Sequence, residues 1–242
     1  MPTEPIYYRR PPRSNSGEIL VLLHGFTGSS ADWDDVLESW AGDYQIIAVD
    51  LRGHGKSGTL TGQFRHRDAA EDVLSLLDGL GVKSCKAIGI SAGGNVLLHM
   101  TTKRPGLISA MVIVSATPYF PDQARSVMRS YGSDIQEAQR DYWKRSHSGG
   151  EHQIQALIAS ARGFADDDDD LAFTPPRLSR IKARVLIVQG DSDPLYPVDL
   201  SVDLAKAIPN ASLWIVPQSG HGPVFGGKRP EFLRICREFL GC

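Results

Sequence analysis

Short, nearly continuous runs of apolar residues alternate along the chain with longer amphipathic stretches. Six of these runs are rich in Val, Ile or Leu and have the length of a strand, without the polar alternation of a half-exposed strand. Such runs are typical of strands that are covered on both faces, as in parallel sheets. They lie at residues 19–23, 45–50, 85–90, 110–115, 184–189 and 212–216.

Helical periodicity follows most of the apolar runs. In residues 68–80, apolar side chains recur on one face and acidic or small polar side chains on the other, as in a helix packed on a sheet. Similar stretches lie at residues 30–40, 92–103, 198–207 and 228–240. This alternation predicts an α/β fold with a doubly wound, mostly parallel sheet and right-handed crossovers.

The alternation stops between residues 118 and 176, where no strand pattern occurs. Three polar amphipathic pieces at 122–131, 135–145 and 152–164 predict helices. We therefore expect a small helical cap, 118–176, inserted into a core formed by residues 1–117 and 177–242. Five consecutive acids, 166–170, come near its end. Adjacent carboxylates lack the spacing of metal ligands, so we interpret this run as a solvated loop.

Composition narrows the possible partners. A chain of 242 residues with 41% hydrophobic and 22% charged residues fits one globular domain. The formal net charge of -2 offers no basic face for nucleic acid. No apolar run is long enough to span a bilayer, and the first residues lack the apolar core of a signal peptide. We expect a cytoplasmic protein with a small-molecule partner, and the pattern leaves its oligomeric state open.

The three cysteines indicate neither a disulfide framework nor a zinc site. Cys85, Cys236 and Cys242 are odd in number and widely spaced. Cys85 lies on a predicted strand and Cys236 on the apolar face of a predicted helix, so both are expected to be core residues.

Ser91 occupies a junction that favours nucleophilic chemistry. It lies in Gly89-Ile90-Ser91-Ala92-Gly93, between an apolar strand and a helix. A turn this sharp strains the central residue and crowds its flanks, which explains glycine two residues to either side. The hydroxyl would stand at a helix N-terminus, where free N–H groups stabilise an anion. Since the pentapeptide also arises by chance, the prediction depends on partners elsewhere.

One such partner follows the strand at residues 19–23. In His24-Gly25-Phe26, Gly25 would let the chain bend and bring the Phe26 N–H toward the helix of the nucleophile. Together with the N–H of Ala92, it would bind the oxyanion of a tetrahedral intermediate.

An acid and a base follow two later strands. Asp191 and Asp193 both come after the strand at 184–189, at the edge where open α/β sheets bind ligands, and either could be the acid. Asp191 could equally cap the turn. His221 lies between two glycines and so has little packing role, and histidine is suited to general base catalysis near neutral pH. The order serine, acid, histidine is the one that this kind of turn predicts.

Taken together, these motifs resemble those of α/β-hydrolases of the serine esterase type. The resemblance extends over residues 24–222 and rests on His24-Gly25-Phe26, Asp50-Leu51-Arg52-Gly53-His54-Gly55-Lys56-Ser57, Gly89-Ile90-Ser91-Ala92-Gly93, Gly190-Asp191-Ser192-Asp193-Pro194 with Pro197, and Gly220-His221.

The resemblance implies a catalytic triad and an oxyanion hole. It makes Ser91 the nucleophile, His221 the base and Asp193, four residues before a proline, the acid that orients the base. The N–H groups of Phe26 and Ala92 would form the oxyanion hole, and residues 118–176 would be the family's cap. No metal or organic cofactor is implied.

The chain departs from the family pattern in three places. Ala92 replaces the methionine or glutamine often found after the nucleophile, which would widen the pocket. The oxyanion segment has a single glycine, which favours ordinary esters over bulky tertiary-alcohol esters. Only residues 6–9 form a strand candidate before residue 19, so the first of the family's eight strands is expected to be missing.

The function that fits these motifs is hydrolysis of a small or medium carboxylic ester through an acyl-enzyme on Ser91. A lactonase, a carbon–carbon bond hydrolase or a perhydrolase could use the same triad, and a non-catalytic small-ligand receptor could share the fold. Dehalogenase and epoxide hydrolase chemistry is disfavoured, because those relatives carry aspartate at the position of Ser91.

The remaining histidines are interpreted as structural. His24 is expected to be hydrogen-bonded beneath the oxyanion segment, and His54 with Ser57 to shape the loop after residue 50. The others show no spacing that favours chemistry and are interpreted as surface or packing residues; they are His66, His99, His147 and His152.

Overall fold

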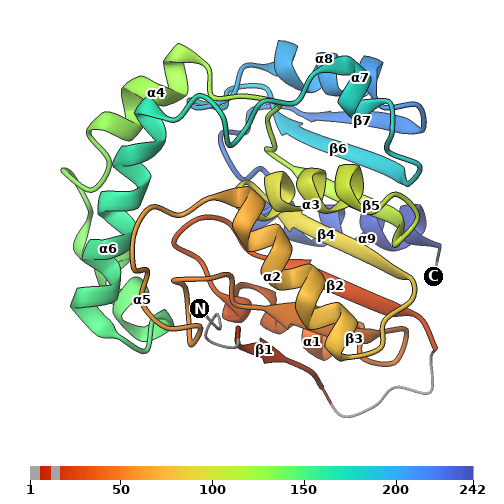
Figure 1. Ribbon diagram of the computed structural model, residues 1–242, viewed down its shortest axis with the longest axis horizontal. Coiled ribbons are helices and arrows are strands. Elements are labelled where there is room, and N and C mark those ends of the chain that lie inside the picture. Colours follow the sequence, from red (N-terminus) through yellow and green to blue (C-terminus); the bar gives the residue numbers. More distant parts are fainter. Residues whose placement is uncertain (1–5, 12–16, 242) are drawn as a thin grey trace.

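The strands form one twisted sheet with a single antiparallel edge. The computed structural model describes residues 6–11 and 17–241. In that part of the chain, seven strands pair in the order β1-β3-β2-β4-β5-β6-β7, and all neighbours are parallel except β1 and β3 (Figure 1). The strands are β1 (Tyr8–Arg9), β2 (Ile19–Leu23), β3 (Gln45–Val49), β4 (Cys85–Ile90), β5 (Ile108–Val114), β6 (Arg184–Gly190) and β7 (Ala211–Val216).

This architecture confirms the predicted doubly wound, mostly parallel α/β sheet. The six apolar runs are all strands, with bounds that differ from the predicted ones by at most two residues. The candidate strand at residues 6–9 is shortened to β1.

Helices cover both faces of the sheet. On one face lie α2 (His66–Gly79), α3 (Ala92–Lys103) and α8 (Val198–Ala207), and on the other α1 (Asp34–Ser39) and α9 (Arg229–Leu240). Since side chains alternate along a strand, the even and odd residues of each central strand enter different cores. Most positions of these strands are therefore apolar, which accounts for the nearly continuous runs.

The predicted helix at residues 30–40 consists of two shorter helices. A 3₁₀ turn at Ser30–Trp33 begins with a capping box, in which Ser29 and Asp32 bond each other's backbone N–H groups. At Trp33 the backbone leaves helical values, with φ -110° and ψ 13°, before α1 starts. The buried Trp33 indole ring takes part in the core of this face.

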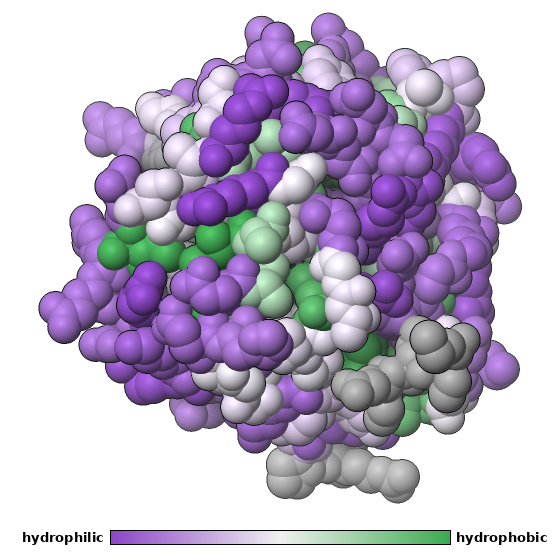
Figure 2. Space-filling model, turned by 60° about the vertical axis from the view of Figure 1, so that its left-hand side comes forward, coloured by the Kyte–Doolittle hydropathy of each residue, from purple (hydrophilic) through white to green (hydrophobic). Residues whose placement is uncertain are grey.

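Residues 118–176, called the inserted segment below, connect β5 to β6 without a strand among these residues. The segment contains α4 (Asp122–Arg129), α5 (Glu137–Ser146), α6 (Gly150–Gly163), a 3₁₀ turn at Phe164–Asp166 and the start of α7 (Pro175–Leu178). The helices α4, α5 and α6 lie together at one end of the sheet (Figure 1). Their outer surface is mostly hydrophilic (Figure 2), as the polar composition predicts.

One buried amide joins the inserted segment to the core. The Gln153 side chain on α6 is fully buried, and its Nε2 donates to the carbonyl oxygens of Gly53 and Gly58 at 3.0 and 2.8 Å and to that of Gly55 at 3.2 Å. Its Oε1 accepts a hydrogen bond from the N–H of Gly149. The contact fixes α6 against the loop that follows β3.

The interpretation of residues 166–170 as a solvated loop is wrong for Asp170. This carboxylate is fully buried, where it accepts hydrogen bonds from His66 Nδ1 at 2.7 Å and from the N–H groups of His66 and Arg67 at the start of α2. Burial raises its pKa, but the hydrogen bonds and the positive charge of His66 outweigh burial and hold the pKa well below the usual range. Asp170 thus caps a helix from which it is separated by about a hundred residues of sequence.

No helix in the described ranges, 6–11 and 17–241, is both long and apolar enough to cross a membrane.

Replacing Asp170 should weaken the fold strongly. Asp170→Asn removes a buried charge and leaves its hydrogen-bond donors poorly paired, so we expect a loss of about 3 kcal/mol in the free energy of unfolding. The difference in stability between wild type and variant should shrink as the pH falls below about 4. A carboxyl with a lowered pKa stabilises the fold only while it is ionised, and this contribution is lost as Asp170 becomes protonated in the folded state. Urea denaturation of wild type and variant at several pH values measures both effects.

Asp166→Asn is the matched control, since Asp166 belongs to the same acidic run but is exposed. A loss of similar size in both variants would contradict the capping role of Asp170.

Candidate active site

Ser91 lies on a strained turn between β4 and α3. Its φ of 50° and ψ of -113° fall in a region that non-glycine residues rarely adopt, at a cost of about 1–3 kcal/mol. Its N–H donates to the carbonyl of Val114 at 2.7 Å, and its carbonyl accepts from Asn95 at 3.0 Å. These contacts hold the side chain at the end of the sheet.

The glycines on either side of this turn leave no space for a side chain. A Cβ on Gly89 would lie 2.5 Å from the carbonyl oxygen of Gly93, and a Cβ on Gly93 would lie 2.4 Å from that of Leu23. The crowding that the sequence predicts at these positions is therefore present.

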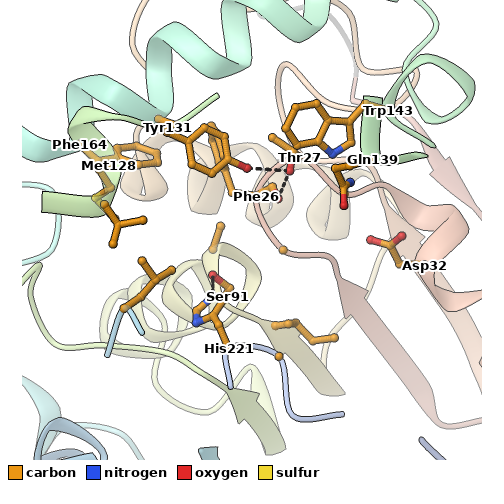
Figure 3. Close-up of a pocket in the computed structure, with 18 of the residues that line it drawn as sticks. Phe26, Thr27, Asp32, Ser91, Met128, Tyr131, Gln139, Trp143, Phe164 and His221 are labelled. Carbon is orange, nitrogen blue, oxygen red and sulfur yellow. Dashed lines mark hydrogen bonds between the residues drawn. The ribbon is translucent and has the colours of Figure 1, made fainter. Parts of the chain in front are cut away.

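The structure brings the three predicted residues Ser91, Asp193 and His221 together. His221 Nε2 lies 2.9 Å from Ser91 Oγ, and His221 Nδ1 lies 2.9 Å from Asp193 Oδ2 (Figure 3). If Nδ1 carries the proton that Asp193 accepts, Nε2 is free to accept the serine proton. The geometry is that of a hydrogen-bonded nucleophile, base and acid.

Asp193 is held ionised although its side chain is buried. Burial raises the pKa, but the hydrogen bond and charge of His221 and the N–H groups of Leu195 and Tyr196 together lower it below its ordinary value. Oδ2, the oxygen that contacts His221, also accepts a hydrogen bond from Gln189 Nε2 at 2.8 Å.

Asp191, the competing acid, supports the loop that carries the histidine. Its two carboxylate oxygens accept the N–H groups of Gln218 and Ser219, and these backbone hydrogen bonds lower its pKa. The loops approach so closely here that a Cβ on Gly190 would lie 2.3 Å from the carbonyl oxygen of Gly220. Asp191 thus takes the turn-capping alternative.

Phe26 and Ala92 both line the cavity that contains Ser91. Ala92 is the first residue of α3, so its N–H has no acceptor within the helix. The N–H of Phe26 makes no hydrogen bond with any other residue of the described chain. Both groups are available to an oxyanion.

The residue of this segment in the left-handed conformation is Thr27, whereas the predicted bend at Gly25 begins a turn closed by the Gly28 N–H and the Gly25 carbonyl at 3.0 Å. Thr27 has a φ of 62°, whereas a Cβ on Gly25 would only touch Ser91 Cβ and Ile90 at ordinary distances of 3.6–3.9 Å. Thr27 Oγ1 donates to the carbonyl of Phe26 at 2.6 Å and lies 3.2 Å from Tyr131 Oη, and these contacts fix the unusual conformation.

His24 and His54 form the floor below the oxyanion segment. The N–H of Leu51 donates to His24 Nε2, and His24 Nδ1 lies 2.7 Å from the carbonyl of Gly25, which confirms the structural role predicted for His24. His54 is fully buried, and burial lowers its pKa far below the usual range, so it is neutral.

The other four histidines divide between core and surface. His99 and His147 are buried packing residues, with pKa values lowered by burial, and His152 is exposed. His66 is buried beside Asp170 but also lines the cavity. No local signal marks that role, because its partner lies far along the chain.

Two further residues of the site were not singled out from the sequence. Gln189 binds the Asp193 carboxylate and the carbonyl of Tyr196, and accepts from Ser201. The sequence does mark Gln189 as unusual, since it is a polar residue at the end of an otherwise apolar buried strand. Ser115, with a φ of 48°, accepts the N–H of Gly222 next to His221.

A cavity of about 680 Å³ opens above Ser91. Its walls include the apolar side chains of Phe26, Phe120, Met128 and Phe164, and helices α4 and α5 complete it (Figure 3). Within the described ranges, no group of three or more His, Cys, Asp or Glu side chains is arranged to hold a metal ion.

The chain is similar to known hydrolases over most of its length. Residues 18–131 match the family model described as the alpha/beta hydrolase fold, and residues 172–231 match that of TAP-like proteins. Three similar proteins extend over most of the chain.

"Putative carbamate hydrolase RutD" of Pseudomonas savastanoi pv. phaseolicola is 29% identical, covering 92% of this chain and 93% of its own length. The pimeloyl-[acyl-carrier protein] methyl ester esterase of Nitrosomonas europaea is 25% identical, with 95% of both chains covered. A solved meta-cleavage product hydrolase from Pseudomonas fluorescens superposes with a TM-score of 0.77 at 18% identity, over 97% of this chain and 93% of its own.

The contacts at the turn predict a contrast between two glycines. Gly93→Ala places a methyl group against the backbone of β2, so it should reduce the free energy of unfolding by about 3 kcal/mol. Gly25→Ala meets only ordinary contacts and should change it by less than about 1 kcal/mol. Urea denaturation of both variants gives the comparison, and a larger loss for Gly25→Ala would refute this account of the turn.

Proposed function

This chain belongs to the α/β-hydrolase fold superfamily, and on that premise we propose that it is a serine hydrolase of small or medium carboxylic esters. The hydrogen-bonded series from Asp193 through His221 to Ser91, at the base of an apolar cavity, is the observation that carries the proposal. A relative named as a methyl ester esterase supports the same class of reaction.

The first half of the reaction forms an acyl-enzyme. His221 Nε2 takes the proton of Ser91 Oγ as the oxygen bonds to the ester carbonyl carbon, and the carbonyl oxygen becomes an oxyanion. The N–H groups of Phe26 and Ala92 stabilise it, each by about 3 kcal/mol. Collapse of the intermediate breaks the bond to the alcohol, which leaves with the proton from Nε2.

The second half releases the acid. A water gives a proton to Nε2 and attacks the acyl carbon, after which Ser91 Oγ leaves and recovers the proton. Asp193 stabilises the imidazolium at both stages and keeps the ring in the required tautomer. No step requires a metal or an organic cofactor.

The inserted segment acts as the cap in this proposal. Residues from α4, α5 and the turn at Phe164–Asp166 line the cavity, so this segment shapes the substrate pocket. The substrate panel includes lactones, compounds cleaved at a carbon–carbon bond, and an ester with hydrogen peroxide as the acyl acceptor, because the same three groups serve those reactions.

Labelling of Ser91 tests the proposal. The wild-type protein should react with a fluorophosphonate probe and hydrolyse p-nitrophenyl butyrate, and Ser91→Ala should lose the label and at least about 10⁴-fold in kcat. Mass spectrometry locates the label, and turnover is followed by absorbance. A folded wild-type protein with neither label nor turnover would disprove the enzymatic proposal.

The two neighbouring acids should differ sharply in their effect on activity. Asp193→Asn alters the tautomer of His221 and should lower kcat by about 10⁴-fold. Asp191→Asn weakens only the support of the loop. It should lower kcat less than tenfold, which corresponds to roughly the free energy of one weakened hydrogen bond. Steady-state kinetics with p-nitrophenyl butyrate decides between them, and equal losses would contradict the assignment of Asp193.

A further inference from the structure

The cavity above Ser91 has an apolar side and a polar side. Phe164 and Met128 lie on the apolar side (Figure 3). On the other side of Phe26 lie Gln139, Asp32 and Trp143 (Figure 3). These three residues and the lining residues in contact with them or with each other are called the polar arm below; the whole set is Thr27, Asp32, Tyr131, Gln139, Tyr142 and Trp143.

The polar arm carries one negative charge and no balancing cation. Among the described residues that line the cavity, Asp32 is the only carboxylate, and none is Lys or Arg. A depression that adjoins the arm is lined by one carboxylate, that of Asp134, and by no Lys or Arg among the described residues. Anionic groups on a substrate would therefore meet repulsion in this part of the cavity.

The hydrogen bonds of Asp32 leave its charge uncompensated. Its carboxylate accepts the hydroxyl of Tyr142 and the N–H of Ser29, which are both neutral donors. The next acids along the chain are paired, Asp34 with Arg9 and Asp35 with Arg229. Arg229 reaches only the backbone carbonyl of Asp32, so the carboxylate forms no ion pair within the described chain.

Aromatic rings surround the same space. The helix α5 presents Gln139, Tyr142 and Trp143, at positions i, i+3 and i+4, to the cavity. The Tyr131 ring stacks against that of Trp143 at 6.3 Å between centroids. The faces of tyrosine and tryptophan attract cations, and this attraction strengthens beside a carboxylate in a partly desolvated site.

We propose that the polar arm is a subsite for a cationic group, an ammonium or quaternary ammonium, carried by the ester substrate. The inference rests on the proposed ester hydrolysis and specifies its substrate class. An ester that places an anionic group in this arm is rejected, and an isosteric neutral ester lies between the two.

Matched esters of equal shape and different charge test the subsite. With charge in the alcohol, the probes are butyrylcholine, its neutral isostere 3,3-dimethylbutyl butyrate and the anionic 2-sulfoethyl butyrate. With charge in the acyl group, the cationic probe is methyl 5-(trimethylammonio)pentanoate. Its neutral isostere is methyl 6,6-dimethylheptanoate, and the anionic probe is monomethyl adipate. In at least one set, kcat/KM should fall about tenfold from the cationic to the neutral ester and about tenfold again to the anionic ester. A tenfold step is the size expected from a partly exposed cation–π contact beside a screened charge.

Charge variants in the arm should change this order in a defined direction. Gln139 is exposed on α5 and makes no ion pair, so Lys and Glu are both tolerated there. Gln139→Lys should reverse the preference toward the anionic ester, and Gln139→Glu should increase the preference for the cation. Asp32→Asn should bring the cationic and neutral esters close to parity.

Asp34→Asn is the control, because it removes the same charge two residues away, outside the cavity lining, and should preserve the order. Equal kcat/KM values for the three charges in both sets, or an order that Gln139→Lys leaves unchanged, would overturn the subsite alone. If the neutral esters are also not hydrolysed and the fluorophosphonate does not react, the proposed function fails and the subsite fails with it.

Discussion

The close approach of backbone segments at the carboxyl end of the sheet is the constraint on which this site depends. At Gly93, the helix after the strained serine meets the backbone of β2, and at Gly190 the end of β6 meets the loop that carries His221. Neither contact leaves room for a Cβ. Because of these contacts, three loops from distant parts of the sequence converge closely enough for two hydrogen bonds of 2.9 Å.

Much of this arrangement could be predicted from the sequence, because the underlying physics is local. A strand buried on both faces needs an apolar residue at each position, so the sheet was visible in the pattern. Glycines on either side of Ser91 indicated a turn with no space for side chains, and the strand ends placed the polar groups at one edge. The sequence could not by itself decide between Asp191 and Asp193, since both follow the same strand and only the fold determines which one reaches the imidazole.

The features that could not be predicted depend on contacts between distant segments. Asp170 looked like one of five equivalent acids, and nothing near it reveals that His66 and the start of α2 require a carboxylate. The left-handed conformation of Thr27 was also not predicted, because glycine is the residue that normally takes it. Here two hydrogen bonds of the threonine hydroxyl hold it instead. The polar arm escaped notice for the same reason, since α5 and the capping box around Asp32 meet only in the folded chain.

The amide of Gln153 has a consequence for how the inserted segment moves. Lifting α6 away from the sheet would break the hydrogen bonds that Gln153 donates to three glycine carbonyls, each with a net worth of about 0.5–1.5 kcal/mol. These hydrogen bonds therefore oppose a movement of the whole segment as one lid. Val127 on α4 and Phe225 line the cavity and are exposed at its wall. A ligand that enters the cavity beside these two side chains therefore leaves the Gln153 hydrogen bonds intact.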